Sequence, residues 1–173
     1  MVRKVNKTSE YVNILRQTDI FYDLTEPQLR MVAALCSEIT SKSGKIIFEE
    51  NSAGDELYVI VQGEVGILLN PALIQSTTTE RPSHPLTIAT LRRGQIFGEI
   101  ALVDQGLRTA SARCTSKRAR LLVIPSDRLT KLCDNYPDLG YRLMRNIAAE
   151  LAFKIRGTDL LIREQLLWRP RSE

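Results

Sequence analysis

The hydrophobic pattern of this chain changes its period near Ser37, and this change constrains the fold more than any other feature. Before it, residues 9–16 and the segment that starts at Thr25 and Pro27 have the apolar spacing and capping of helices. After it, glycine-containing turns separate three short runs of β-branched and aromatic residues: 45–48, 57–61 and 65–69. Runs this short and closely spaced favour antiparallel strands joined by tight turns. We therefore expect N-terminal helices followed by antiparallel strands.

The second half of the chain repeats the strand pattern and then returns to helices. A polar loop with several prolines at 70–85 is expected to be exposed. The strands predicted after it are 86–91, 109–114 and 120–124. Ser126 and Asp127 are expected to cap a helix over 128–134, and Pro137 is expected to begin the last helix.

The last helix carries its apolar residues on one stripe, which predicts that one face packs on the rest of the protein. The stripe comprises Leu139, Leu143, Ile147, Leu151 and Ile155. Gly157 is expected to kink or break this helix, since glycine costs about 1 kcal/mol relative to alanine in a helix interior. Together the elements predict an α+β fold, in which about eight antiparallel strands form a jelly-roll barrel with N-terminal helices and long C-terminal helices. We expect one structural domain in three parts: an N-terminal helical segment at 1–36, the β-barrel at 37–126 and the C-terminal helices at 127–173.

Composition and charge exclude several classes of protein. The 173 residues carry a formal net charge of +4, a mild excess that suits an anionic partner without requiring one. No apolar run approaches the roughly 18 residues that cross a bilayer, and the N-terminus lacks a secretory signal, so we expect a cytoplasmic protein without a membrane segment. Cys36, Cys114 and Cys133 lack metal-site spacing and are expected to be buried hydrophobes. The single histidine, His84, has no nucleophile beside it, so we expect no enzyme activity, no catalytic residue and no metal.

The segment 97–112 holds the residues with the most specific chemistry. Arg108 presents a planar fork of donors that matches two phosphate oxygens, and Glu99, nine positions earlier, can accept from a sugar hydroxyl. A short helical turn that begins at Glu99 would direct backbone N–H groups at an anion. Gly98 permits close approach of the backbone, and the Thr109 hydroxyl can donate to a phosphate or a purine edge. From these residues alone, a surface ion pair of Glu99 with Arg108, worth about 0–1 kcal/mol, is the alternative.

Further motifs surround this segment in a fixed order. They are Gly44 before Ile47-Phe48, Gly54-Asp55-Glu56-Leu57-Tyr58-Val59-Ile60, Gly63, Phe97-Gly98-Glu99 and Arg108-Thr109-Ala110. This set resembles the cyclic-nucleotide-binding domain family of bacterial catabolite activator proteins, kinase A and G regulatory domains and nucleotide-gated channels, over about residues 21–155. The resemblance implies that Arg108 binds the cyclic phosphate and Glu99 the ribose 2′-hydroxyl. The ligand-binding residues that it implies are Gly98, Glu99, Ile100, Ala101, Arg108, Thr109 and Ala110. Leu107 departs from the family, where proline is frequent before the arginine, and this departure affects the rigidity of the turn.

The sequence leaves the identity of the nucleotide open. The family likeness puts Lys154 near the purine edge, where lysine can donate to guanine O6 and N7, and puts Thr109 where cGMP-selective domains also carry threonine, so guanine is mildly favoured. A solvated surface lysine is the alternative for Lys154. Arg92 and Arg93 are candidates to reach the second phosphate of a cyclic dinucleotide, or else are solvated turn residues. The expected regulatory ligand is therefore cyclic di-GMP, as in the similar cyanobacterial receptors, or one of cAMP and cGMP, with no other cofactor.

The ligand is expected to act through protein contact. Transcription factors that resemble this domain continue after the long helix with a helix-turn-helix unit, for which residues 158–169 are too few, so no direct DNA binding is expected. We expect a second-messenger receptor that relays occupancy to a partner protein, for example a transcription factor. The leucine-rich segment 159–169 would cover the pocket, form a homodimer with the C-terminal helices of a second copy, dock a partner, or pack on its own barrel. The alternative for the whole chain is a nucleotide-free oligomerisation or scaffold module of the same fold.

Overall fold

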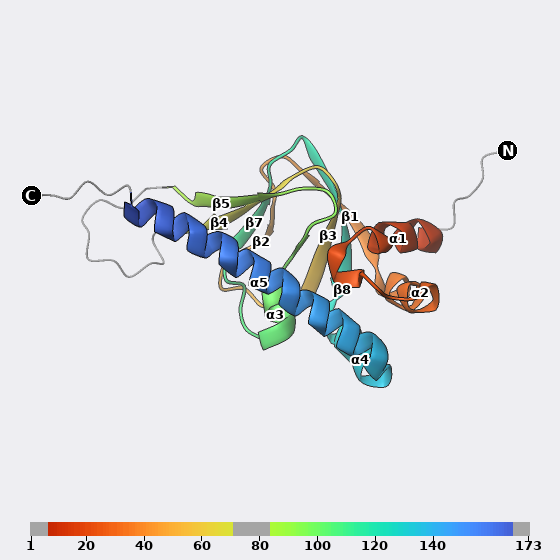
Figure 1. Ribbon diagram of the computed structural model, residues 1–173. Coiled ribbons are helices and arrows are strands. Elements are labelled where there is room, and N and C mark those ends of the chain that lie inside the picture. The colour runs from red at the N-terminus through yellow and green to blue at the C-terminus, as the bar shows by residue number, and fades with distance from the viewer. Residues whose placement is uncertain (1–6, 71–83, 168–173) are drawn as a thin grey trace, which may run out of the picture.

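The computed structural model describes residues 7–70 and 84–167, and its elements follow the expected order (Figure 1). The N-terminal elements are α1 (Lys7–Arg16), the 3-10 turn η1 (Asp19–Phe21) and α2 (Glu26–Leu35). The strands are β1 (Ser37–Lys42), β2 (Ile46–Phe48), β3 (Glu56–Gln62), β4 (Val65–Leu69), β5 (Leu86–Leu91), β6 (Ile96–Phe97), β7 (Ser111–Cys114) and β8 (Arg118–Pro125). The other helices are α3 (Glu99–Asp104), α4 (Ser126–Asn135) and α5 (Pro137–Leu167). Most of the loop predicted at 70–85 lies outside the described residues.

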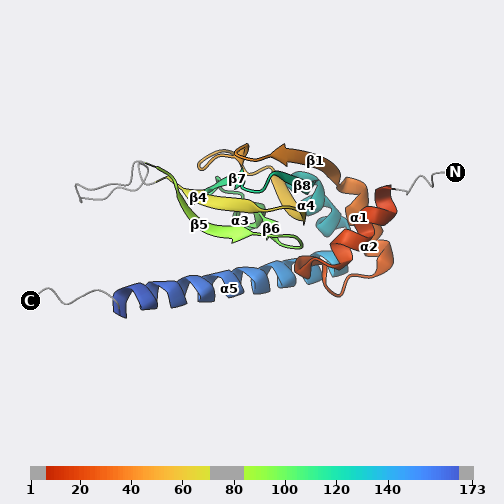
Figure 2. The same cartoon turned by 90° about the horizontal axis from the view of Figure 1, so that it is seen from above.

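The strands form two antiparallel sheets that lie as the layers of a jelly roll (Figure 2). One sheet has the strand order β1-β8-β3-β6 and the other the order β2-β7-β4-β5. Neighbouring strands are mostly distant in sequence, as where Tyr58 of β3 lies between Val123 of β8 and Phe97 of β6. This arrangement confirms the predicted α+β jelly roll with helices at both ends.

The central strands bury both of their faces, and the period of two separates the two cores. Leu57 and Val59 of β3 face the helices, whereas Tyr58 and Ile60 face the opposite sheet. The core under the helices also contains the first part of α5, together with α1, α2, η1 and α4. The two cores therefore hold β3, and with it β6 and the start of α3, in a fixed place.

The cysteines contribute to packing, as expected. Cys114 is buried, and Cys36 and Cys133 are half-buried against the core under the helices. Burial raises the pKa of the Cys36 thiol to about 12, because an apolar environment disfavours the thiolate. The surroundings of Cys36 therefore favour the protonated thiol over the thiolate.

The two predicted helix caps have different outcomes. Thr25 forms a complete capping box with Gln28, and Pro27 lies in the first turn, as predicted for α2. The cap predicted at Ser126 is wrong, because α4 already includes this residue and Pro125 occupies the N-cap position. The Ser126 hydroxyl is buried without a hydrogen-bond partner in the described structure. Its backbone N–H instead donates to the carbonyl of Asp55 at 2.8 Å.

The long helix α5 has an anchored half and a free half. Leu139, Leu143 and Ile147 are fully buried, but Ile155 is 62% exposed, so only the first part of the predicted stripe packs. The break predicted at Gly157 is wrong, since α5 continues as one helix to Leu167 and runs along the two-layered body (Figure 2). Within the described ranges no helix, α5 included, combines the length and the apolar character that crossing a bilayer needs.

Candidate functional site

A sharp turn at Gly98 starts the segment that holds the predicted binding residues. Gly98 has a φ of 84°, which lets the chain pass from β6 directly into α3, a helix whose first turn has no side-chain cap. Gln105 ends α3 in the left-handed conformation, and the chain returns to Arg108 just before β7. Local geometry therefore brings the start of α3 and the Arg108 turn to the same side of β3.

Arg108 is a buried cation whose hydrogen bonds and ion pairs only partly offset its burial. Only 3% of its surface is exposed, and its guanidinium lies over the Phe48 ring at 4.2 Å from the centroid. Its Nη1 donates to the carbonyl of Gly98 at 3.1 Å and its Nη2 to the carbonyl of Glu56 at 2.7 Å. The only carboxylate that it meets in the described residues is that of Glu56, at 3.8 Å, and its Nε has no hydrogen-bond partner there.

Burial has an electrostatic cost for this guanidinium. It lowers the pKa of Arg108, because desolvation disfavours the charged form, although Tyr58 and nearby carboxylates act in the opposite direction. Phe48, Tyr58 and Phe97 form a cluster of rings beside it, with Tyr58 stacked on Phe97 at 4.9 Å. The result is a rigid positive group that has apolar support and an unused donor, a combination that favours a small anion.

Glu99 is also buried, and its partner comes from α5. The residue is 4% exposed, and Lys154 Nζ lies 2.9 Å from its Oε1. Lys154 also donates to the carbonyl of Ile96 at 3.4 Å and lies 3.5 Å from Glu150 Oε1. Since the side chain of Lys154 is 31% exposed and held by these three groups, its interpretation as a solvated surface lysine is wrong.

The structure brings together some of the other predicted residues and separates two of them. Ala101 and Ala110, each two positions after Glu99 or Arg108, are buried, whereas Ile100 and Thr109 are exposed. Arg92 pairs with Glu64 at 2.9 Å, and Arg93 Nη2 donates to Gln17 Oε1 at 3.4 Å. Both arginines therefore have partners outside the segment 97–112.

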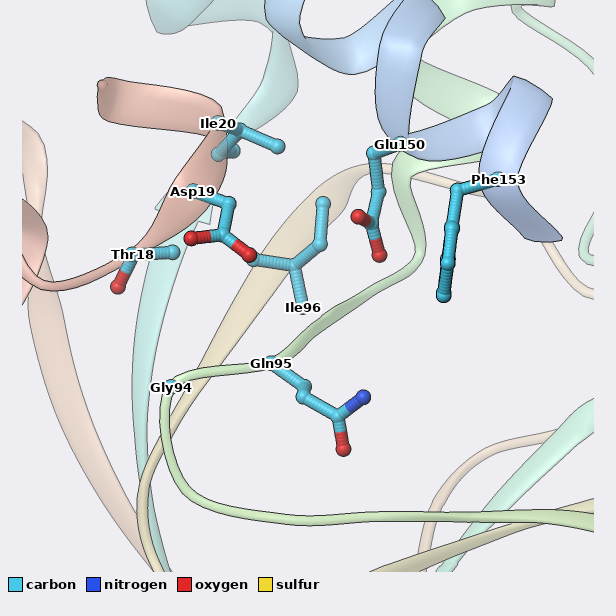
Figure 3. Close-up of a pocket in the computed structure, with 8 residues that line it drawn as sticks. All are labelled: Thr18, Asp19, Ile20, Gly94, Gln95, Ile96, Glu150 and Phe153. Carbon is cyan, nitrogen blue, oxygen red and sulfur yellow. The ribbon is translucent and has the colours of Figure 1, made fainter.

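A cavity of about 210 Å³ lies between η1, the turn at Gly94 and α5 (Figure 3). Its lining comprises Thr18, Asp19, Ile20, Gly94, Gln95, Ile96, Glu150 and Phe153. A neighbouring hollow shares Asp19 and Glu150. Neither is lined by Glu99 or Arg108, whose side chains are instead closed in by protein.

Sequence reasoning missed the contacts that close the site. Phe48 and Glu56 belong to motifs quoted for the family resemblance, but nothing in their local pattern indicated that they hold Arg108. The pairing of Lys154 with Glu99 spans 55 positions. No hydrophobic period or motif spacing encodes a contact between a helix and a turn so far apart.

This chain is similar in sequence to known proteins. The model of the cyclic nucleotide-binding domain matches residues 38–136. The chain is 29% identical over 137 residues to the cGMP-dependent protein kinase, isozyme 2 forms cD5/T2, of Drosophila melanogaster, covering 79% of this chain and 14% of the kinase. It is 27% identical over 146 residues to the cyclic AMP receptor protein of Thermus thermophilus, covering 84% of this chain and 61% of that protein.

A solved structure extends the likeness to the fold. A crystal structure from Geobacter metallireducens GS-15 matches with a TM-score of 0.67 at 30% identity, covering 82% of this chain and 95% of that one. By contrast, the chain spans less than two thirds of the length of the curated relatives named above.

Proposed function

This chain belongs to the cyclic nucleotide-binding domain family, and from that membership we propose that it is a receptor for a cyclic nucleotide, whose phosphate binds Arg108 and whose ribose 2′-hydroxyl binds Glu99. The family is a regulatory one, and its kinase members carry enzyme activity in other domains. Binding, rather than catalysis, is accordingly the activity proposed for this chain.

The observation that carries the proposal is the state of Arg108. A buried charge is stable only when it is paired and hydrogen-bonded. Arg108 has two backbone carbonyls, one carboxylate at 3.8 Å and an Nε without a partner in the described residues. A phosphodiester oxygen would supply both the missing acceptor and the missing negative charge.

Glu99 and Gly98 support the same interpretation. Lys154 donates to Glu99 Oε1, and a carboxylate has a second oxygen that accepts hydrogen bonds. In the described parts of the chain no hydrogen bond to this second oxygen is found, so it can accept from a sugar hydroxyl. Gly98 has no Cβ between the guanidinium of Arg108 and the start of α3. The missing side chain therefore lets the guanidinium lie against the backbone at the start of α3, where we propose that it meets the phosphate.

We propose a cyclic mononucleotide rather than a cyclic dinucleotide. The second phosphate of cyclic di-GMP would need Arg92 and Arg93, which have partners in Glu64 and Gln17. Relatives of this chain include cGMP-dependent kinases and a cyclic AMP receptor protein. Guanine stays mildly favoured over adenine because of Thr109, whereas Lys154 gives no support, since its donors are already engaged.

The test is nucleotide binding by the full chain, first in a melting panel of cAMP, cGMP, cyclic di-GMP and cyclic di-AMP, then by calorimetry. Replacing Arg108 with alanine removes a charge-assisted bond of about 1.5–3 kcal/mol, which corresponds to a loss of affinity of about 10- to 150-fold. Arg128→Ala is the matched control, because Arg128 is exposed on α4. Unchanged affinity of Arg108→Ala would contradict the phosphate role.

One observation favours a second candidate, a scaffold module that binds no nucleotide. Protein groups close in Glu99 and Arg108, and neither hollow described above opens onto them. A ligand that binds only the folded state raises its stability. If no nucleotide of the panel stabilises the chain, the receptor proposal fails and the scaffold is the candidate that stays.

The distal half of α5 is the surface through which we propose that occupancy is passed on. Its exposed large apolar residues are Phe153, Ile155, Leu160, Leu161, Ile162 and Leu167. Phe153, Leu160 and Leu167 are seven positions apart, which is the spacing of a seam between paired helices. We propose that a second copy of this chain covers this seam, since a two-fold axis would pack the seam residues of one α5 against the same residues of the other.

A further inference from the structure

Lys154 is the last point at which α5 is tied to the body by a polar contact. Earlier in the helix, Arg142 and Asn146 donate to backbone carbonyls of Asp23, Ile20 and Tyr22. After Lys154, no side chain of α5 in the described residues has a hydrogen bond or ion pair to another element. The junction between the anchored and the free half of α5 thus coincides with a contact to the proposed binding site.

The contact uses the whole ammonium group. A lysine ammonium has three donors, and Lys154 has three acceptors around it: Glu99 Oε1, the carbonyl of Ile96 and Glu150 Oε1. Two of these groups, Ile96 and Glu150, also line the cavity of Figure 3. Lys154 therefore joins β6, the start of α3 and α5 at a single point.

The pairing also determines which cation takes the charge of Glu99. The Glu99 side chain is only 5% exposed, so its carboxylate needs a partner. Burial lowers the pKa of Arg108, and the charge of Glu99 is the smallest of the influences that oppose this shift. The cation that forms the ion pair with Glu99 is Lys154. Because Lys154 pairs with Glu99, the carboxylate of Glu99 is not the counter-ion of Arg108, and the guanidinium is left to bind the phosphate. The same pairing keeps the carboxylate of Glu99 oriented for the ribose hydroxyl.

We propose that Lys154 is a positioning residue that sets Glu99 for the ribose hydroxyl and transmits occupancy of the site to the distal half of α5. The inference rests on the proposed function and deepens it. A hydroxyl that donates to the free oxygen of Glu99 fixes the carboxylate, and a fixed carboxylate holds Lys154 and the turn of α5 around it more firmly. Ligand binding thereby orders the beginning of the free half.

The first experiment needs no ligand and measures amide hydrogen exchange along α5. In Lys154→Met, amides at residues 151–158 are expected to exchange about 3- to 10-fold faster than in the wild type, since local opening loses its tie. The anchored residues before 148 should not change. Lys131→Met is the matched control, because Lys131 is an exposed lysine on α4 with a partner in the same helix. Equal exchange in Lys154→Met and the wild type would overturn the proposal.

The second experiment crosses the protein variant with a ligand variant, using cGMP and cAMP beside their 2′-deoxy analogues. In the wild type, loss of the hydroxyl should weaken binding about 10-fold. In Lys154→Met and Lys154→Gln, removing the 2′-hydroxyl should weaken binding by only about 2-fold or less, because the carboxylate of Glu99 is no longer held in the orientation that accepts from the hydroxyl. Lys154→Arg should restore the dependence on the hydroxyl. Both Lys154→Met and Lys154→Gln are measured, so that the test still gives a result if one of the two variants does not fold.

The outcomes separate the two proposals. A wild-type chain that binds no nucleotide overturns the receptor function, and with it the transmission by Lys154. A wild type and a Lys154→Met variant that both bind, with equal dependence on the 2′-hydroxyl, overturn only the role of Lys154.

Discussion

At Gly98, the absence of a side chain decides the geometry of the whole binding segment. The residue has a φ of 84°, and a Cβ at this position would meet the guanidinium of Arg108 and the carbonyl of Glu56. The same residue gives its carbonyl to Arg108 Nη1. Position 98 therefore requires glycine for its backbone conformation, for space and for the contact that holds the arginine.

Gly98→Ala is expected to destabilise the fold by about 1–3 kcal/mol, because alanine is strained at positive φ and displaces a buried charge. Nucleotide affinity should fall with it. Thermal unfolding and calorimetry measure the two effects. Gly157→Ala is the matched control, since a Cβ there meets nothing within 4 Å and lies in a helix interior. The control should gain about 0.5–1 kcal/mol, and a loss of stability equal to that of Gly98→Ala would contradict the argument.

The residue scale is also where the sequence was most informative about the site. Gly98, Glu99 and Arg108 lie within eleven positions, so a local turn is enough to bring them near each other. Their types alone indicated an anion and a hydroxyl. The partners that close the site come from β2, β3 and α5, and no local pattern indicated them.

At the scale of elements, strands and helices depend on different signals. The strands β4 and β5 have the predicted bounds, because turn residues mark the ends of a short strand: Gly63 precedes β4, Gly94 follows β5, and a proline-containing segment lies between the two strands. Helix starts are less certain, since serine and threonine favour a cap only where the helix actually begins. Thr25 stands at such a position, whereas Ser126 is already inside α4.

This difference can be measured with one substitution at two sites. Thr25→Ala removes a capping box and is expected to cost about 0.5–2 kcal/mol. Ser126→Ala removes a buried hydroxyl without a partner in the described residues, and should be neutral or stabilising. Denaturant unfolding at constant pH gives both values. An equal loss in the two variants would show that Ser126 acts as a cap after all.

At the scale of the whole molecule, α5 joins the body to an exposed apolar surface. Its first half completes the core under the helices, and its second half exposes apolar residues along the length of the two sheets (Figure 2). Exposed apolar residues in such number on one helix are typical of an interface. The fold thus puts the proposed output next to the binding site, with Lys154 between them.

The proposed pairing of two copies has a direct test in solution. The wild-type chain should be a dimer by light scattering at micromolar concentration, and Leu160→Glu should be a monomer, because a charge in the seam is not compensated. Tyr141→Glu, an exposed position in the anchored half of α5, is the control and should remain dimeric. A monomeric wild type would rule out the second copy and point to a partner protein, such as a transcription factor, on this surface.

The sequence by itself determined the order of helices and strands, the jelly-roll class and the segment that carries Gly98, Glu99 and Arg108, because all of these follow from patterns within about ten positions. Only the tertiary structure decided that Lys154 holds Glu99, that Phe48 and Glu56 enclose Arg108, and which half of α5 is buried. These contacts join residues far apart in the chain, and they exist only once the two sheets and α5 have packed together.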